Sequence, residues 1–250
     1  MPPTFTRPSA NDGDVSILSG KDTFERLRGK FIVLDGIDGA GKGAQLERLQ
    51  EGLDSVGIEF IRTRDPGGTK IGDRIRHVLL DYDLSEMDVR CETLLFMASR
   101  AQLVRDVINP ALKDGVTVLG DRYVSATCAY QGAAGYDPKS VIDLAKFAIG
   151  DVWPHLTMVL DMPPKEAFKR TNRKSPAQRK SAGAEGQTML FHDVHTDAME
   201  SRPIEFHQRV RELFLELPKL YPAPVAIVDG EGTVDEVHAR ILEALAHAAL

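Results

Sequence analysis

The sequence has few cysteines and no long apolar run. Only Cys91 and Cys128 are present, and they lie too far apart to form a CxxC metal or redox pair. We expect both to be small buried side chains in a reducing cytoplasm. No apolar stretch approaches the roughly 20 residues of a membrane-spanning helix, and the polar, proline-bearing N-terminus lacks the apolar core of a signal peptide. We therefore expect a cytoplasmic protein without a membrane partner.

An excess of positive charge is also lacking, since the formal net charge is -6. A nucleic acid polymer needs a basic face, so this charge argues against such a partner, whereas a single nucleotide needs only a local cluster of basic residues. The chain has 250 residues, of which 42% are hydrophobic, enough for one substantial core. We expect a mostly disordered extension over residues 1–28 and a single domain over residues 29–250.

The most informative stretch runs from residue 31 to residue 45. Residues 31–34 form an apolar run typical of a strand buried on both faces. The sequence GIDGAGK follows at 36–42 and leads into an amphipathic helix. Strand, glycine loop and helix are the setting of a phosphate-binding P-loop, in which bare N–H groups and Lys42 meet an oligophosphate. A glycine-rich turn that binds nothing is the alternative. The hydroxyl residue that normally follows the lysine is absent, because Gly43 and Ala44 stand there.

Strands and helices alternate along the rest of the chain. We expect strands at 30–35, 58–62, 116–119, 156–160 and 225–228. We expect helices at 42–56, 71–80, 91–108, 125–131, 139–149 and 234–248, with Asn109-Pro110 ending the third of these. This alternation predicts an α/β protein with a P-loop NTPase-type parallel five-stranded sheet flanked by helices. In such sheets ligands bind beyond the carboxyl ends of the strands. The glycine loop, the DPGGT loop at 65–69 and the Asp121-Arg122 pair all fall there.

Between residues 165 and 201 the alternation stops. Basic residues crowd together in this insertion, namely Arg170, Arg173, Lys174, Arg179 and Lys180. In a phosphate-handling fold this pattern predicts a lid that closes over substrate, although a solvated charge run is the alternative.

Phosphoryl transfer depends mainly on positioning and on charge neutralisation. Lys42 and the loop backbone would hold the donor, and Arg76 and Arg122 are placed to hold an acceptor. Asp121, at a strand end near the glycine loop, could hold hydrated Mg²⁺ or the attacking oxygen. An arginine of the lid could stabilise the charge of the transferred group.

At this point the sequence resembles the thymidylate kinase family, one of the nucleoside monophosphate kinases. The motifs that carry the resemblance occur in order: GIDGAGK at 36–42, DPGGT at 65–69 followed by Ile75-Arg76, LLFMASRAQ at 94–102, DRY at 121–123, AYQG at 129–132 and LDMPP at 160–164. The likeness extends from about Lys30 to the C-terminus and is weakest in the lid.

The resemblance implies transfer of a phosphoryl group from ATP to dTMP with Mg²⁺ as cofactor, and a homodimer. It implies that the phosphates of ATP contact Gly36, Gly39, Ala40, Gly41, Lys42, Gly43 and Ala44. For dTMP it implies a sugar contact from Asp38, phosphate contacts from Arg76 and Arg122, stacking on Phe96, a base hydrogen bond from Arg100, and further sugar or base contacts from Thr127, Tyr130 and Gln131. Catalytic roles are implied for Lys42, Asp121, Arg122 and a lid arginine, with Asp121 as the Mg²⁺ ligand through water.

Two departures from the family pattern keep alternatives open. The residues Gly43 and Ala44 provide no hydroxyl, and Ala198 stands where relatives carry an arginine in the lid. Arg170, Arg173 or Arg202 could supply the missing charge, and we take Arg173 as the candidate. A kinase for another nucleoside monophosphate and a non-catalytic nucleotide-binding protein are the alternatives to an active thymidylate kinase.

Overall fold

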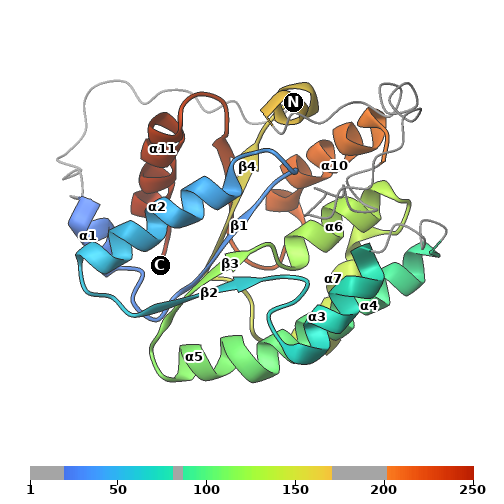
Figure 1. Ribbon diagram of the computed structural model, residues 1–250, viewed down its shortest axis with the longest axis horizontal. Coiled ribbons are helices and arrows are strands. Elements are labelled where there is room, and N and C mark those ends of the chain that lie inside the picture. The colour runs from blue at the N-terminus through green and yellow to red at the C-terminus, as the bar shows by residue number, and fades with distance from the viewer. Residues whose placement is uncertain (1–19, 81–86, 171–201) are drawn as a thin grey trace, which may run out of the picture.

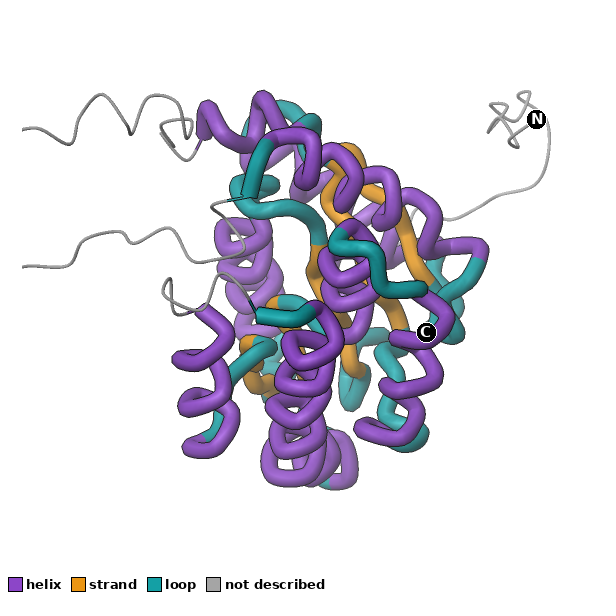
Figure 2. The backbone as a smooth tube through the Cα atoms, turned by 90° about the vertical axis from the view of Figure 1, so that its right-hand side faces the viewer, coloured by secondary structure: helices purple, strands orange, loops and turns teal. Residues whose placement is uncertain are grey.

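The structure is a computed structural model that describes residues 20–80, 87–170 and 202–250. In these ranges a five-stranded parallel sheet lies between helices on its two faces (Figure 1). Figure 2 shows the same layers from the side, with the strands in the middle and helices on either side of them. The predicted α/β class and the five-stranded parallel sheet are confirmed.

Short apolar strands build the sheet. The central strand β1 (Phe31–Asp35) is buried at every position. The other strands are β2 (Phe60–Arg64), β3 (Thr117–Asp121), β4 (Leu156–Asp161) and β5 (Val225–Asp229), and the spatial order is β2-β3-β1-β4-β5. Leu34 of β1 is in register with Asp121 of β3, and Arg64 of β2 is also in register with Asp121. The carboxyl ends of β1, β2 and β3 are therefore level, and the loops that follow them open at one edge.

Helices α1 (Gly20–Glu25), α2 (Lys42–Ser55) and α11 (Val234–His247) pack together on one face of the sheet. The other face carries α4 (Val89–Leu103), α6 (Val124–Ala133), α7 (Pro138–Ile149) and α10 (Ile204–Glu216), with α3 (Lys70–Leu80) packed on α4. The remaining elements are α5 (Asn109–Lys113), α8 (Pro164–Arg170) and the 3-10 turn η3 (Leu217–Lys219). Within the described ranges, no helix is both long and apolar enough to cross a membrane.

The expected helix end at Asn109-Pro110 is wrong. After α4 the chain passes through a π-helical turn, η2 (Val104–Ile108), and continues into α5, which begins at Asn109. Pro110 lies in the first turn of α5, where a missing backbone N–H costs nothing because that group has no partner inside the helix. The wider π turn before it lets the helical path go on past the proline ring.

Helices α8 and α10 also lie where the sequence analysis placed no helix. Helix α10 follows the basic insertion and buries His207, Val210, Leu213 and Phe214, a spacing of three and four residues that marks one helix face. Helix α8 occupies the first part of the insertion expected at 165–201, and its Ala167 is buried. The rest of that insertion, including Arg173 and Ala198, lies outside the described residues.

Part of the segment expected as an extension packs onto the domain. Phe24 of α1 is only 7% exposed, and its ring lies against Gly52 of α2, where an added Cβ would come within 1.9 Å of a ring atom. The guanidinium of Arg26 donates hydrogen bonds to the carbonyls of Ala246 (2.8 Å) and Ala248 (2.6 Å) at the end of α11. Residues 20–28, which the sequence analysis assigned to the extension, therefore include a helix and contact α2 and α11, and the predicted domain bounds stay a prediction.

Candidate functional site

The loop between β1 and α2 presents an open helix N-terminus. Gly41, the residue before α2, has a left-handed backbone (φ 96°), and no side chain caps the first turn. Uncapped N–H groups at the N-terminus of a 14-residue helix form an anion site. Gly36 begins the loop with φ 127°, and a Cβ there would lie 2.6 Å from the carbonyl oxygen of Leu160, so only glycine fits.

Lys42 is folded into this loop. Its Nζ donates to the carbonyls of Gly36 (3.0 Å) and Ile37 (2.9 Å) and lies 3.8 Å from a carboxylate oxygen of Asp38. Burial, together with the nearby charge of Arg122, lowers the pKa of Lys42 to about 8. An anion bound to the loop would favour the protonated amine and compete with these two carbonyls for it.

A network of polar side chains lies beside the loop. Arg122 donates from Nη1 to Asp35 (3.2 Å) and from Nη2 to Asp38 (2.5 Å). The hydroxyl of Ser125 donates to Asp35 (2.6 Å), and that of Tyr130 donates to Asp38 (3.0 Å). Asp35 is completely buried at the end of β1, and burial raises its pKa against the opposing effect of Arg122. The network fixes Arg122 between a buried carboxylate and one that faces the site.

The backbone of Arg122 supports this placement. Its φ is 67°, which makes it the one residue other than glycine with a positive φ in the described part of the chain. An arginine held in this region is strained by about 1–3 kcal/mol, and such strain occurs preferentially at ligand sites. Burial alone would lower the pKa of Arg122, but Asp38, Tyr130 and Asp35 together raise it above its ordinary value.

A second buried arginine lies at the opposite side of the site. Arg100 of α4 is 1% exposed and donates from Nε to Asp65 at 2.5 Å. Its Nη2 donates to the hydroxyl of Thr127 (2.9 Å) and to the carbonyl of Tyr123 (3.1 Å). Burial raises the pKa of Asp65, and the charge of Arg100 acts against that rise. These contacts lock the guanidinium plane of Arg100, which lines the cavity.

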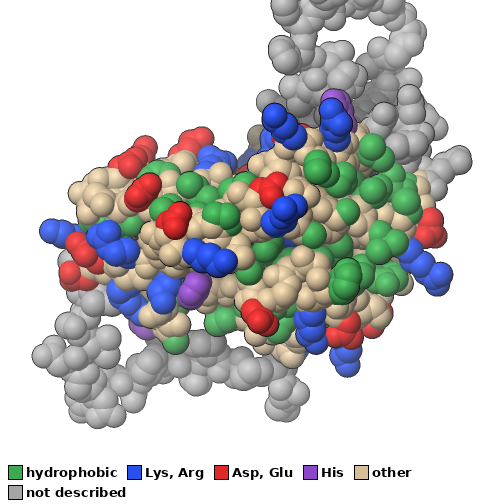
Figure 3. All heavy atoms as spheres, turned by 90° about the horizontal axis from the view of Figure 1, so that it is seen from below, with side chains coloured by type: hydrophobic (Ala, Val, Ile, Leu, Met, Phe, Trp, Pro, Cys, Tyr) green, Lys and Arg blue, Asp and Glu red, His purple; other side chains and the backbone are tan. Residues whose placement is uncertain are grey.

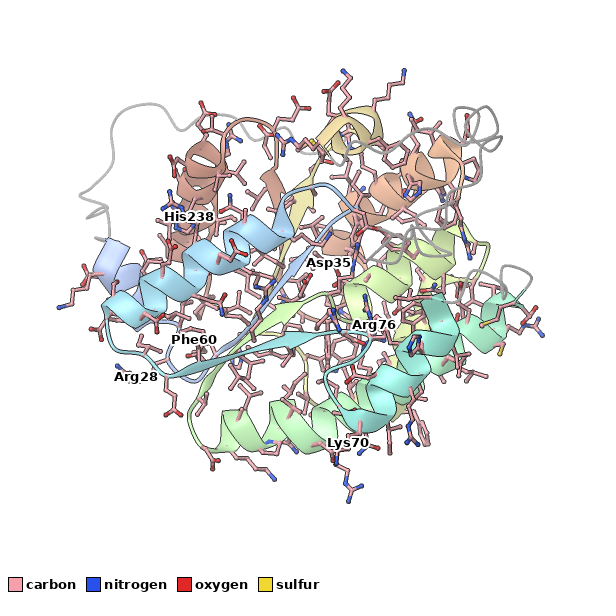
Figure 4. All side chains as sticks on the ribbon, viewed as in Figure 1. Arg28, Asp35, Phe60, Lys70, Arg76 and His238 are labelled. Carbon is pink, nitrogen blue, oxygen red and sulfur yellow. The ribbon has the colours of Figure 1, made fainter. Side chains whose placement is uncertain are left out.

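The loop after β2 brings Arg76 to the same edge of the sheet. Arg76 donates to the carbonyl of Pro66 (2.9 Å), and the backbone N–H of Gly67 donates to the hydroxyl of Ser99 on α4 (3.0 Å). Figure 4 shows Asp35 at the end of β1 and Arg76 on α3 on the same side of the molecule, away from His238 on α11.

A cavity of about 410 Å³ joins these groups. That volume suits a small organic ligand. Five basic side chains and three carboxylates line it among the described residues, so its walls carry excess positive charge. The lining residues are Asp38, Gly39, Gly41, Lys42, Gly43, Ala44, Arg64, Asp65, Pro66, Arg76, Leu80, Phe96, Arg100, Asp121, Arg122, Ala126, Thr127, Tyr130 and Gln131.

Comparison with known proteins places the chain in a family. The family model described as thymidylate kinase matches residues 34–241. The chain belongs to the thymidylate kinase family. A thymidylate kinase of Syntrophotalea carbinolica is 42% identical over 84% of this chain and 92% of its own length. The thymidylate kinase of Nitratidesulfovibrio vulgaris is 38% identical over 86% of this chain and 95% of its own length. That of Kosmotoga olearia is 37% identical over 85% of this chain and 93% of its own length. The resemblance that the motifs indicated is thus confirmed.

The fold of this thymidylate kinase family member brings nearly all the predicted site residues together. Every residue expected to contact dTMP lines the cavity, as do Asp121, Lys42 and most of the glycine loop. Gly36 and Ala40 belong to the loop but do not line the cavity. Arg173 lies outside the described residues. The roles assigned to the individual residues remain predictions.

Several residues of the site were not predicted. Asp35 holds Arg122 and is itself held by the hydroxyl of Ser125, and Asp65 holds Arg100. Arg64 lines the cavity, and its side chain makes no hydrogen bond or ion pair within the described ranges. A signal existed for Asp35, because an acidic residue that directly follows four buried apolar residues in a central strand needs a charged partner.

The donor set near the loop suits Mg²⁺ only through water and substrate. Asp121 lines the cavity, and its nearest basic partner is Arg62 at 3.7 Å, a loose pair that leaves carboxylate oxygens accessible. Among the described residues, no group of three or more His, Cys, Asp or Glu side chains could hold a metal ion. Mg²⁺ commonly keeps several waters and binds one or two carboxylates plus substrate phosphates, so a single carboxylate fits that mode.

Proposed function

We propose that this protein transfers the γ-phosphoryl group of ATP to dTMP, forming dTDP and ADP. The observation that carries the proposal is the continuity of the cavity, which runs from the uncapped N-terminus of α2 to the buried Arg100 on α4. One end offers backbone N–H groups and Lys42 to an oligophosphate. The other offers an aromatic ring and fixed polar groups, a suitable site for a flat base.

Each side chain of this site has a proposed task. Arg76 and Arg122 hold the phosphate of dTMP, and Arg64 adds a third positive charge at the same edge. Phe96 stacks on the base while Arg100 donates to a base carbonyl, with Thr127, Tyr130 and Gln131 beside base and sugar. Asp38 accepts a hydrogen bond from the sugar hydroxyl. Lys42 holds the transferring phosphoryl group of ATP.

The reaction needs little covalent help from the protein. A phosphate oxygen of dTMP forms the new bond to the γ-phosphorus, while the bond from that phosphorus to the bridging oxygen breaks and leaves ADP. The attacking oxygen already carries charge, so the residues act by alignment and charge neutralisation and not as a general base. Mg²⁺, held at Asp121 through water, would neutralise charge on the phosphates of ATP. An arginine of the insertion, for which we propose Arg173, would add positive charge at the transferred group.

We further propose a homodimer that forms through α3 and α4. These helices expose Ile71 (52%), Val78 (42%) and Leu94 (55%), which are large apolar side chains on neighbouring helices. Figure 3 shows hydrophobic side chains gathered on the right half of the face seen from below, where α3 and α4 lie. Light scattering should give twice the chain mass for the protein, and V78E should give a monomer. We also propose that the enzyme acts in the cytoplasm, where Cys91 and Cys128 would stay the free thiols that they are here.

The activity is tested by measuring ADP release from ATP and Mg²⁺ with dTMP, dUMP, dCMP, UMP, AMP or GMP as separate acceptors. We expect turnover with dTMP and weaker turnover with dUMP. Lys42→Met should abolish turnover but keep calorimetric binding of dTMP, because Lys42 acts on the donor. Binding of dTMP to the unmodified protein without turnover on any acceptor would instead make it a non-catalytic nucleotide-binding protein.

A further inference from the structure

Glu92 is a buried carboxylate beside the cavity to which no role has been assigned. It lies on α4, and its side chain is only 7% exposed. A charged group in such a position needs partners, and Glu92 has one on each carboxylate oxygen. Gln131 donates from Nε2 to Oε2 at 3.2 Å, and Arg202 donates from Nη2 to Oε1 at 3.0 Å.

The partner amide belongs to a residue of the cavity wall. Gln131 of α6 is completely buried and lines the cavity. Its Nε2 is occupied by Glu92, whereas its Oε1 has no hydrogen-bond partner within the described part of the chain. A buried acceptor without a partner is costly, so a ligand that donates a hydrogen bond to this oxygen would recover that cost.

Chemistry decides which way the Gln131 amide points. An ionised carboxylate can only accept hydrogen bonds, so Gln131 must turn its NH₂ group toward Glu92 and cannot turn its oxygen there. Burial raises the pKa of Glu92, and the ion pair with Arg202 opposes that rise and favours the ionised form on which this restriction depends. Arg202 is itself held over the ring of Phe206, with its Cζ 4.6 Å from the ring centroid.

We propose that Glu92 is a positioning residue that fixes Gln131 as a hydrogen-bond acceptor for the base, and that this selects thymine over cytosine. The inference rests on the proposed function, because it takes the cavity to hold a pyrimidine monophosphate. Thymine and uracil carry a hydrogen on N3, which the fixed Oε1 can accept. Cytosine carries a lone pair at N3, which would face the same oxygen and be repelled.

If Glu92 did not fix its orientation, the Gln131 amide could form a hydrogen bond with either base. A glutamine that is free to rotate presents its oxygen to thymine and its NH₂ group to cytosine, so a pocket with a mobile amide discriminates poorly. The part of the selectivity that Gln131 carries is therefore assigned to the charge of Glu92, one residue removed from the ligand.

The variant Glu92→Gln tests this directly because it preserves size and hydrogen bonding. A glutamine at position 92 can both donate and accept, so it pairs with Gln131 in either orientation. We expect the ratio of kcat/KM for dTMP to kcat/KM for dCMP to fall by about 10-fold, the effect of one hydrogen bond of ordinary strength. The change should appear mainly in the two KM values. A merely structural role would lower both activities together and leave their ratio unchanged.

Two further variants keep the test specific. In a Gln131→Met background, which has no amide to orient, Glu92→Gln should leave the ratio unchanged. Arg202→Met removes the ion pair but leaves the carboxylate beside Gln131. Burial already raises the pKa of Glu92 and the loss of Arg202 raises it further, so the ratio is compared at about pH 9, where it should stay within about 2-fold of the unmodified protein. An equal shift in Arg202→Met, or a shift that persists without the Gln131 amide, would overturn the inference. Failure of the unmodified protein to phosphorylate dTMP would overturn the proposed function itself.

Discussion

The buried pair of Arg100 and Asp65 offers a sharp test of how the site is held together. Asp65 is 2% exposed, and Arg100 is the one side chain that hydrogen-bonds to it within the described ranges. Replacing Arg100 by methionine keeps most of the apolar volume but leaves the carboxylate of Asp65 in the interior without a counter-charge. The hydroxyl of Thr127 and the carbonyl of Tyr123 each lose a donor as well.

Removal of one partner from a buried pair costs about 3–5 kcal/mol. In a chain of this length that corresponds to a fall of about 6–20 °C in the melting temperature. We expect Arg100→Met to lose this much stability in urea unfolding monitored by circular dichroism. The second variant, Asp65→Asn in the Arg100→Met background, removes the stranded charge and should recover about 2 kcal/mol.

The loss should also depend on pH in a defined direction. Burial raises the pKa of Asp65 in the folded protein, and the charge of Arg100 opposes that rise. A raised carboxyl pKa contributes stability that is full below the pKa of the unfolded chain and is lost as pH rises through the folded pKa. Without Arg100 the folded pKa rises further, so the stability deficit of Arg100→Met should be smaller at about pH 5 than at about pH 8. A deficit below about 1 kcal/mol, or one that Asp65→Asn does not reduce, would refute this account of the pair.

Three further predictions follow from single contacts. A Cβ at Gly43 would meet no atom of the described residues within 4 Å, so the variant Gly43→Ser should fold normally. Because it places a hydroxyl next to Lys42, it should lower the Mg²⁺ concentration that gives the half-maximal rate. An unchanged or higher Mg²⁺ requirement would contradict this prediction. The pKa of Lys42 is about 8, so the amine is about half protonated near that pH and should take up at most about half a proton when ATP binds. Calorimetry in buffers of different ionisation enthalpy measures this uptake. The variant Lys42→Met should show none. Phe24→Ala should lower the free energy of unfolding by about 3–5 kcal/mol, because the ring is 7% exposed and packs against Gly52. Thermal unfolding measures this loss. An unchanged stability would show that α1 does not pack on the domain.

The sheet was predictable because its signals are local. Most strands are short and mainly apolar, although β2 is mixed, and each of the first three ends in polar residues that topology brings to one edge. Helix α10 was predictable from the same kind of pattern, since its buried positions repeat every three or four residues, but the neighbouring basic insertion masked it. The path through Pro110 was not predictable, because a π turn depends on the packing of the whole helix and leaves no mark in composition.

The residues of the candidate site also fall into two groups, those that sequence motifs identify and those that they do not. Residues that face the ligand belong to motifs, and nearly all of them line the cavity. Residues that hold those side chains, such as Asp35, Asp65 and Glu92, act through contacts between distant segments. Asp35 and Ser125 are 90 positions apart in the chain, and Gln131 and Glu92 are 39 apart. No periodicity or spacing reports such a contact, so only the three-dimensional structure identifies which side chain each carboxylate holds.

Arg122 is already paired with two carboxylates, and this shapes how a nucleotide would enter. Arg122 bonds one carboxylate that is fully buried, Asp35, and one that is 23% exposed, Asp38. A phosphate can displace the exposed partner at little cost in desolvation, whereas displacing Asp35 would strand a charge in the core. In the proposed function, the phosphate of dTMP therefore takes the place of Asp38 on Arg122, and the carboxylate of Asp38 accepts a hydrogen bond from the sugar hydroxyl instead. One exchange of partners would then supply both contacts, because Asp35 keeps the guanidinium in place throughout.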